Sequence, residues 1–263
     1  MLNSKNSGIV VNNQRCLYFD DIFLASYPRS GNTWMRLLLS DLILQKHGFE
    51  TDTELPIPAD KIVPGIEDNK IISDARLQPN YQIIKTHWFY SKVNEILAKP
   101  SWTPKVIYLF RNPADSLCSF FYLKSYLARM NGLEANSRNL SSIEKFCLKK
   151  VDRWCQHLKG YIHMKESDRE KILFISYESM HEDLISILKN ITEFIGFPID
   201  EPMAEKAIEN HRFEKKKTQD PSFFRKGKIG SSKEELSSEV LSLIEEKTIQ
   251  IYNTARNLEY SNL

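Results

Sequence analysis

The chain has 263 residues, of which 41% are apolar and 27% are charged, and a chain of this size and composition folds around a large buried core. The 36 lysines and arginines nearly balance the 34 aspartates and glutamates. This balance excludes the strong overall field that would draw a protein onto nucleic acid or an anionic membrane. Any anion that binds must therefore be held by local charges.

The cysteines and the N-terminal segment bear on metal binding and export. The four cysteines form no C-x-x-C pair and no zinc-type spacing with histidine, so reduced and mostly buried thiols are expected. The N-terminal segment lacks the apolar run of a signal peptide, and no apolar stretch elsewhere approaches ~20 residues. We therefore expect a cytoplasmic protein without a metal site.

Short apolar runs alternate with segments of helical periodicity, the pattern of a parallel α/β protein. Four runs have the composition of central strands, and they span residues 22–26, 81–85, 106–110 and 172–176. Helices are expected over residues 32–45, 113–130, 143–163, 182–195, 201–210 and 237–258. The pattern indicates one domain over residues 1–263, and the motifs described below fall between about residues 21 and 230.

Local signals refine this prediction at three places. Asn112 and Pro113 suit the cap and the first position of the second helix, because proline needs no amide partner there. Residues 50–80 contain four prolines, and residues 214–230 are rich in charge. Both of these segments are expected to be long surface loops, which often carry function.

The segment SYPRSGNTW, residues 26–34, joins the first strand to the first long helix. At this junction of a parallel sheet, ligands meet a helix N-terminus that carries about half a positive charge. Gly31 allows close backbone approach, Arg29 adds a full charge, and neighbouring polar side chains add donors. The segment predicts a phosphate or sulfate site, although a turn in which Ser30 or Asn32 merely caps the helix fits it too.

A P-loop nucleoside triphosphatase is the more specific alternative. It requires G-x-x-x-x-G-K-[ST], and this loop has no lysine followed by serine or threonine to hold Mg²⁺. The apolar strands also end in Arg111 and Tyr177 rather than in aspartate. The anion site is therefore expected to work without a metal.

Three segments in order resemble the sulfotransferases that use 3′-phosphoadenosine 5′-phosphosulfate (PAPS). YPRSGNTW at residues 27–34 resembles their 5′-phosphosulfate loop, usually YPKSGTTW. VIYLFRNPADSLCS at 106–119 resembles their 3′-phosphate motif, and FFRKGKIG at 223–230 resembles the late loop that closes over the same phosphate. The resemblance implies a single α/β domain with a central parallel sheet flanked by helices, in a P-loop-kinase-like sulfotransferase fold.

The resemblance also implies which residues hold the nucleotide. Around the 5′-phosphosulfate and the adenine it implies Arg29, Ser30, Gly31, Asn32, Thr33 and Trp34. On the 3′-phosphate it implies Arg111, Ser119, Phe224, Arg225, Lys226 and Gly227, and on the adenosine it implies Tyr177 and Phe213. Planar guanidinium groups suit a dianionic phosphate on physical grounds as well. Two alternatives stay open, since Trp34 also fits a core position and Arg111 also fits a strand-end salt bridge.

His87 is the candidate general base. It alone among the six histidines follows the carboxyl end of a predicted strand, and an imidazole with a pKa near ~6.5 can accept a hydroxyl proton at neutral pH. A lone histidine is more often structural, but KTH at 85–87 resembles the family's catalytic Lys-x-His segment. The resemblance then gives Lys85 and Arg29 the task of stabilising charge on the leaving oxygen.

The expected reaction is direct in-line transfer of the sulfuryl group to a hydroxyl or amine of a small acceptor, such as an alcohol, a phenol or an amine, with release of adenosine 3′,5′-bisphosphate (PAP). Neither a metal nor a covalent enzyme intermediate is expected. The acceptor should contact the 50–80 loop, residues 88–90 and the face of the 120–129 helix. The aromatic side chains there suit a partly apolar pocket or the core, and they are Trp88, Phe89, Tyr90, Phe121, Tyr122 and Tyr126.

The sequence departs from the family pattern in the first and late loops. Arg29 replaces the usual lysine, so the leaving-group contact could shift towards Lys85. Ser231 and Ser232 follow Gly230 where the family has Asp-Trp. A short C-terminal dimerisation motif is not recognisable, so the oligomeric state stays open. A PAPS-site protein without turnover and a phosphotransferase of P-loop ancestry are the rival functions, and a secretory-pathway sulfotransferase would be expected to start with a membrane anchor.

Overall fold

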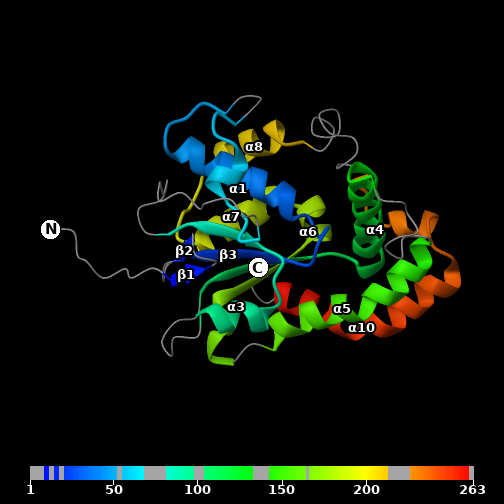
Figure 1. The fold of residues 1–263 in the computed structure, drawn as a ribbon. Coiled ribbons are helices and arrows are strands. Elements are labelled where there is room, and N and C mark those ends of the chain that lie inside the picture. Colours follow the sequence, from blue (N-terminus) through cyan, green and yellow to red (C-terminus); the bar gives the residue numbers. More distant parts are fainter. Residues whose placement is uncertain are drawn as a thin grey trace.

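A four-stranded parallel sheet forms the centre of the protein (Figure 1). The computed structural model describes residues 9–11, 15–17, 21–51, 55–67, 81–97, 104–132, 142–163, 166–212 and 226–260. The strand order is β4-β3-β5-β6, and the bounds are β3 (Ile22–Ser26), β4 (Ile83–Thr86), β5 (Val106–Phe110) and β6 (Ile172–Ser176). The parallel α/β prediction is confirmed, and three strands have the predicted bounds. The predicted strand 81–85 is displaced, since β4 starts two residues later and ends one residue later.

The prediction of four central strands is correct for β3 and β5 only. Within the described part of the chain, β4 and β6 lie at the two edges of this sheet. A separate antiparallel pair, β1 (Ile9–Val11) and β2 (Arg15–Leu17), was not predicted. Three-residue strands are too short to produce a recognisable alternation of apolar and polar residues.

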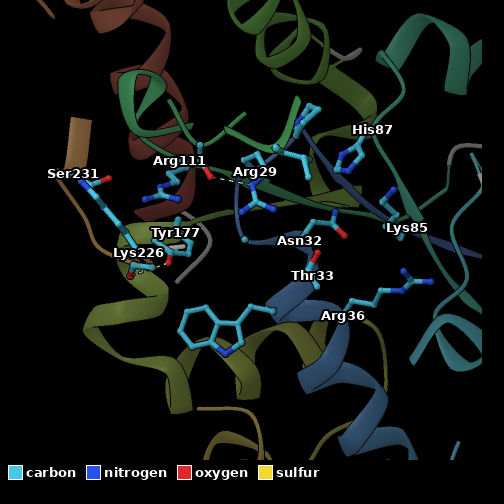
Figure 2. Close-up of a pocket in the computed structure, with 16 residues that line it drawn as sticks. Arg29, Asn32, Thr33, Arg36, Lys85, His87, Arg111, Tyr177, Lys226 and Ser231 are labelled. Carbon is cyan, nitrogen blue, oxygen red and sulfur yellow. Dashed lines mark hydrogen bonds between the residues drawn. The ribbon is translucent and has the colours of Figure 1, made fainter. Parts of the chain in front are cut away.

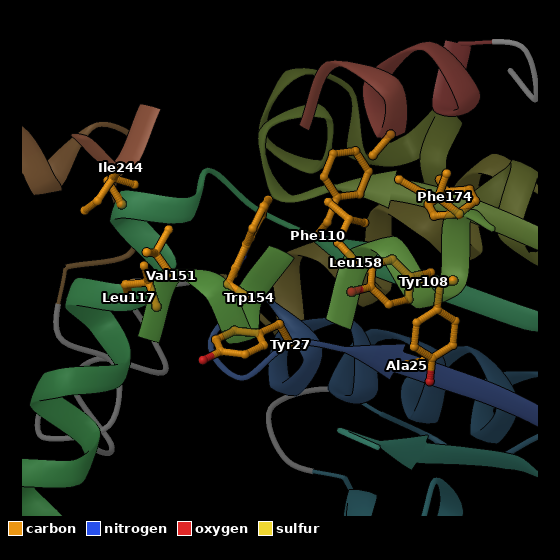
Figure 3. Close-up of a cluster of buried hydrophobic side chains, with 14 of the residues drawn as sticks. Ala25, Tyr27, Tyr108, Phe110, Leu117, Val151, Trp154, Leu158, Phe174 and Ile244 are labelled. Atoms are coloured by element: carbon orange, nitrogen blue, oxygen red, sulfur yellow. The ribbon is translucent and has the colours of Figure 1, made fainter. Parts of the chain in front are cut away.

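Helices cover both faces of the sheet because successive strand residues point to opposite sides. On one face, Leu24 and Ile107 belong to a buried cluster with α1 (Asn32–Lys46), α7 (Leu184–Phe194) and α8 (Glu201–Asn210). On the other face, Tyr108 and Phe174 pack with α4 (Pro113–Met130), α5 (Ile143–Ile162) and α10 (Ser238–Tyr260), as Figures 1 and 3 show. The strands are therefore buried on both sides, as their continuous apolar runs require.

Most helix predictions are confirmed to within two residues, and the predicted bounds of α4 and α8 are correct. Asn112 accepts a hydrogen bond from the Asp115 amide at 3.2 Å, and Pro113 is the first helical residue. The predicted helix over 182–195 is wrong at its start. The chain forms α6 (Tyr177–Glu182) and then α7, because Asp183 leaves the helical conformation and caps α7 through the Ser186 amide. The short helices α2 (Ala59–Ile62) and α3 (Tyr90–Leu97) were not predicted.

The proline-containing segment 55–67 is only partly a surface loop. Ile62, Val63 and Ile66 are buried, and Gly65 forms a parallel bridge with Lys85 at the edge of β4. Prolines remove periodicity from a sequence, but they do not prevent its apolar side chains from packing. The prediction of an entirely exposed loop is therefore wrong for this part, while most of the 214–230 loop lies outside the described residues.

No helix in the described ranges is both long enough and apolar enough to cross a membrane. Cys118 and Cys147 are buried free thiols, and Cys155 is a half-buried one. The expected burial is therefore confirmed for Cys118 and Cys147.

Candidate active site

A pocket opens at the carboxyl edge of the sheet, where the loops after β3, β4 and β5 meet (Figure 2). His87 and Lys85 lie at one end of it, Arg111, Tyr177 and Lys226 lie at the other, and Arg29 lies between them. The lining residues are Pro28, Arg29, Gly31, Asn32, Thr33, Trp34, Arg36, Lys85, His87, Arg111, Ser119, Leu123, Tyr177, Lys226, Gly227 and Ser231.

The loop after β3 is shaped by backbone conformation. Gly31 is the cap residue of α1 with a left-handed φ of 93°, and no side chain caps the helix. A Cβ atom on Gly31 would lie 2.8 Å from Cδ2 of Tyr177, so both the backbone and the available space require glycine. Arg29 also has a positive φ of 73°, an uncommon value for a residue with a side chain. The alternative that Ser30 or Asn32 merely caps α1 is therefore wrong.

Asn32 and Ser30 have different surroundings in this loop. The Asn32 amide group donates to the Leu24 carbonyl at 3.1 Å and to the Ser26 hydroxyl at 3.0 Å, so this side chain fixes the loop to β3. Ser30 is fully buried, and its Oγ has no hydrogen-bond partner among the described residues. It does not line the pocket, although the resemblance implies that it contacts the phosphosulfate.

Two arginines approach the pocket from different strands. The Arg29 Nε donates to the Ser119 hydroxyl on α4 at 2.9 Å, which joins residues of the first two motifs. Arg111, at the end of β5, is buried with its guanidinium 4.2 Å above the Tyr177 ring. Its Nη2 lies 3.7 Å from the Asp115 carboxylate, so the strand-end ion pair does exist. Arg111 therefore both pairs with an acid and lines the pocket.

Asp115 also anchors the described end of the late loop. Its carboxylate accepts hydrogen bonds from the Gly230 amide at 2.6 Å and from the Ser232 amide at 2.8 Å. Arg111 donates to the Lys228 carbonyl at 3.0 Å. Residues 230–232, where the sequence departs from the family pattern, are thus held to the start of α4 by backbone hydrogen bonds that do not depend on the missing Asp-Trp side chains.

Lys226 lines the pocket but is shared with two acids. Its ammonium lies 2.7 Å from Glu235 and 2.9 Å from Glu234. Hydrogen bonding to Glu235 and then to Glu234 raises the pKa of Lys226. Its charge is therefore retained at neutral pH but is partly neutralised by these neighbours.

An aromatic group lies beside the first loop. The Tyr177 ring is 6.1 Å from Trp34 and 4.6 Å from His181, and Trp34 is 5.2 Å from His181. The Tyr177 hydroxyl donates to the Gly227 carbonyl at 3.1 Å. Trp34 is half-buried and also packs against the apolar cluster under α1, so the core and pocket positions both apply to it.

The position of His87 sets its tautomer. Nδ1 lies 2.8 Å from the Ser26 carbonyl, which can only accept, so Nδ1 must carry the hydrogen. The other ring nitrogen, Nε2, is then the basic one. The His87 carbonyl lies 3.1 Å from Nε2 of His157. Burial lowers the pKa of His157 to about 4, so that second imidazole is neutral at neutral pH.

Glu67 joins Lys85 and His87. Its carboxylate lies 3.3 Å from the Lys85 ammonium, and it accepts hydrogen bonds from the Thr86 hydroxyl at 2.8 Å and from the His87 amide. Burial alone would raise the pKa of Glu67, but the Lys85 charge and the His87 amide outweigh burial and lower it. The carboxylate is therefore charged, and it holds the end of β4 in place.

The structure brings most of the predicted residues into one pocket. Twelve of them line it, which are Arg29, Gly31, Asn32, Thr33, Trp34, Lys85, His87, Arg111, Ser119, Tyr177, Lys226 and Gly227. Phe213, Phe224 and Arg225 lie outside the described residues. Sequence reasoning missed Arg36 and Glu67. Arg36 lies one helical turn after Asn32, so α-helical spacing could have found it, whereas no local signal marks Glu67.

The residues that the structure describes contain no group of three or more histidine, cysteine or acidic side chains that could hold a metal ion. The cationic and donor groups that line the pocket are those that suit phosphate and sulfate. A parallel sheet with such groups at its carboxyl edge, around a loop that leads into a helix, is the arrangement of α/β proteins that bind phosphate-bearing or sulfate-bearing ligands.

The family model described as "Sulfotransferase domain" matches residues 19–250, and the chain therefore belongs to the sulfotransferase family. It is 27% identical to the flavonol 3-sulfotransferase of Flaveria bidentis, over 86% of this chain and 80% of that protein. It is 28% identical to the amine sulfotransferase of Oryctolagus cuniculus, over 84% of this chain and 76% of that protein. The chain is thus an enzyme of the sulfotransferase class.

Solved structures show the same fold. The mouse sulfotransferase SULT7A1 complexed with PAP has a TM-score of 0.64 at 21% identity, over 93% of this chain and 89% of that chain. A retinol dehydratase in complex with androsterone and inactive cofactor PAP has a TM-score of 0.62 at 22% identity, over 88% of this chain and 80% of that chain. The predicted P-loop-like sulfotransferase fold is confirmed.

Proposed function

We propose that this enzyme transfers the sulfuryl group of PAPS to a hydroxyl or amine of a small acceptor by direct in-line displacement. One observation carries the proposal: Arg29 and Arg111 converge on a single pocket that also contains His87 and Lys85. The pocket therefore offers separate cations for two anionic groups and places a base at one end. This arrangement suits a donor that carries anionic groups on both the 3′ and the 5′ positions of its ribose.

The donor pocket offers two anion sites. The backbone of residues 31–34 at the start of α1, together with Arg29, would hold the 5′-phosphosulfate, since a helix start and a guanidinium both favour an anion. Arg111, Ser119 and Lys226 would hold the 3′-phosphate. The buried Nε of Arg111, which has no hydrogen-bond partner among the described residues, fits an anionic ligand, because buried polar groups normally have a partner.

The rings of Tyr177 and Trp34 would contact the adenine part, since aromatic faces stack on planar bases. Bound in this way, PAPS would supply an activated sulfuryl group. The predicted roles of Phe213, Phe224 and Arg225 in nucleotide binding remain proposals.

His87 would act as the general base. Its Nδ1 hydrogen is used by the Ser26 carbonyl, so Nε2 would accept the proton of the attacking hydroxyl or amine. A positioned base contributes about 10² to 10⁴ in rate. Because Nδ1–H···O=C fixes the ring orientation, His87 would need no rearrangement before it accepts the proton.

Lys85 would stabilise the negative charge that grows on the leaving oxygen. Its ammonium is held at 3.3 Å by Glu67, which positions it but also reduces its net charge. Arg29 and Arg36 line the same pocket and would share this task. The departure of Arg29 from the usual lysine is therefore compensated by other cations nearby.

A protein that binds PAPS without turnover is the rival, and the presence of Lys85 and His87 in the pocket favours the enzyme. The relatives bear names that refer to flavonol and amine sulfotransferases, which supports a small acceptor. Cytoplasmic location, metal-independent action and a single domain over residues 1–263 are proposed with it.

The proposal is tested by heating the protein with PAP in the presence of EDTA. A ligand at a hundred times its dissociation constant adds about 2.7 kcal/mol, so the melting temperature should rise by several degrees. ATP with magnesium serves as the control and should give a smaller rise. Equal stabilisation by ATP, or none by PAP, would count against the PAPS site.

A further inference from the structure

Four cations on α4 and α5 influence one another, and one of them, Arg153, lies close to the segment that follows the base. Lys124 lies on α4, and Lys149, Lys150 and Arg153 lie on α5. Within the described part of the chain, none of the four has an acidic partner at ion-pair distance. Burial lowers the pKa of Lys150, and so do Arg153, Lys149 and Lys124 in that order. The charges of the other three cations therefore act on Lys150, and an anion among them would relieve this repulsion.

A wall of aromatic rings connects this cluster to His87. The Arg153 guanidinium lies 5.3 Å from the Phe89 ring, two residues after the base. Phe89 is 5.0 Å from the ring of His157, which lies one helical turn beyond Arg153 and contacts the His87 carbonyl at 3.1 Å. Arg153 is thus linked through the rings of Phe89 and His157 to the segment that carries the base.

Lys124 has a similar aromatic neighbour on α4. Lys124 lies 5.3 Å from the Phe120 ring, and Phe120 is 5.9 Å from the ring of Tyr27. Ser119 and Leu123, the residues before Phe120 and Lys124, line the donor pocket. Phe120 and Lys124 therefore lie on α4 next to the stripe of the helix that lines the donor pocket.

Tyr27 provides an independent observation. Its hydroxyl is buried without a hydrogen-bond partner among the described residues, and Figure 3 shows it pointing away from Tyr108. Burial raises the pKa of Tyr27 to about 12, although the Arg153 charge opposes this. The phenol is therefore protonated, and it is a donor of the kind that an oxyanion accepts from.

We infer that the acceptor is an anion: a molecule with an aromatic or apolar body whose hydroxyl or amine reaches His87, while a carboxylate or other oxyanion lies among Arg153, Lys150 and Lys124. The aromatic rings suit the apolar body of such an acceptor. The cations, which have no acidic partner among the described residues, suit its negative charge. This inference rests on the proposed function and names the acceptor class for the same site.

The test uses phenols that differ in charge. The acid 3-(4-hydroxyphenyl)propanoate is compared with its methyl ester, and 2-(4-hydroxyphenyl)ethyl phosphate distinguishes a phosphate from a carboxylate. Transfer from labelled PAPS is measured for the wild type and for Arg153→Gln and Lys150→Gln. Lys189→Gln removes a cation on α7 that pairs with Glu201 and serves as the matched control.

The acid or the phosphate should exceed the ester in kcat/KM by about fivefold or more, and Arg153→Gln should remove most of this preference while leaving the ester unchanged. The preference should also fall as the salt concentration rises from about 0.05 to about 0.5 M. An ester used as well as both anions, or an equal loss for anion and ester in Arg153→Gln, overturns the inference.

Binding decides the case in which no probe is turned over. With the protein saturated by PAP, an additional rise in melting temperature with an anionic phenol and not with the ester supports the inference, and its absence overturns it. Failure of PAP itself to stabilise the protein would instead overturn the proposed function. The two failures are therefore distinguishable.

Discussion

Replacement of His87 by asparagine tests the base most sharply, and its effect should approach the full contribution of a general base. The substitution removes Nε2, the nitrogen left basic by the 2.8 Å contact of Nδ1 with the Ser26 carbonyl. The neighbouring His157 cannot replace it, because its two nitrogens face the Tyr108 hydroxyl at 2.8 Å and the His87 carbonyl at 3.1 Å. Burial also keeps its pKa at about 4. We expect kcat to fall by about 10² to 10⁴, or about 3 to 5 kcal/mol in activation free energy.

The assay measures sulfuryl transfer from labelled PAPS together with the thermal shift that PAP produces. His87→Asn should lose turnover and keep the PAP shift, because no nucleotide contact is assigned to the imidazole. His163→Asn, an exposed histidine at the end of α5, is the control and should change neither quantity. Turnover within about threefold of the wild type would refute the role of His87, and a lost PAP shift would show that the histidine acts through the shape of the site.

Three further substitutions test the geometry around the pocket. Gly31→Ala should destabilise the protein by about 1 to 2 kcal/mol, because alanine is strained in a left-handed backbone conformation. It should also weaken PAP binding, because the new Cβ would lie 2.8 Å from the Tyr177 ring. The control Gly48→Ala, at a φ of +78° with no atom within 4 Å, should show only the loss of stability in thermal melts. Arg111→Lys keeps the charge but loses the planar fork, so calorimetry should show PAP binding about tenfold weaker. Glu67→Gln removes a carboxylate whose pKa is lowered in the folded protein. The charged carboxylate therefore stabilises the fold above its ordinary pKa of 4.5, and this stabilisation is lost as the pH falls through the lowered pKa. The difference in unfolding free energy between wild type and variant should shrink on acidification, and a difference that widens would contradict the lowered pKa.

The fold was predictable where a local signal decides the structure. The apolar runs of β3, β5 and β6 are buried on both faces, so composition alone marks them. The Asn112–Pro113 pair fixed the start of α4. The helix α6 was missed because its six residues are too few to show a helical period. The packing of residues 62–66 was missed because it depends on the distant edge of β4.

The candidate site shows the same difference between local sequence signals and long-range contacts. Its anion loop and its Lys-x-His segment are contiguous in sequence, so they were visible before the structure. Glu67 approaches Lys85 from 18 residues away, and the contact of Arg29 with Ser119 spans 90 residues. Lys124 on α4 and Arg153 on α5 likewise belong to two helices that only tertiary packing brings together. Long-range contacts of this kind have no periodic or motif signal to report them.

The central claim is that separate groups in one pocket hold the two phosphates of a single adenine nucleotide. Calorimetric titration with PAP, adenosine 5′-monophosphate and adenosine 3′-monophosphate in EDTA tests it directly, in the wild type and in Arg111→Lys. Since charge-assisted hydrogen bonds contribute about 1.5 to 3 kcal/mol, PAP should bind at least about tenfold more tightly than either mononucleotide, and Arg111→Lys should weaken PAP and the 3′-monophosphate while leaving the 5′-monophosphate unchanged. A 5′-monophosphate that binds the wild type as tightly as PAP would contradict the claim.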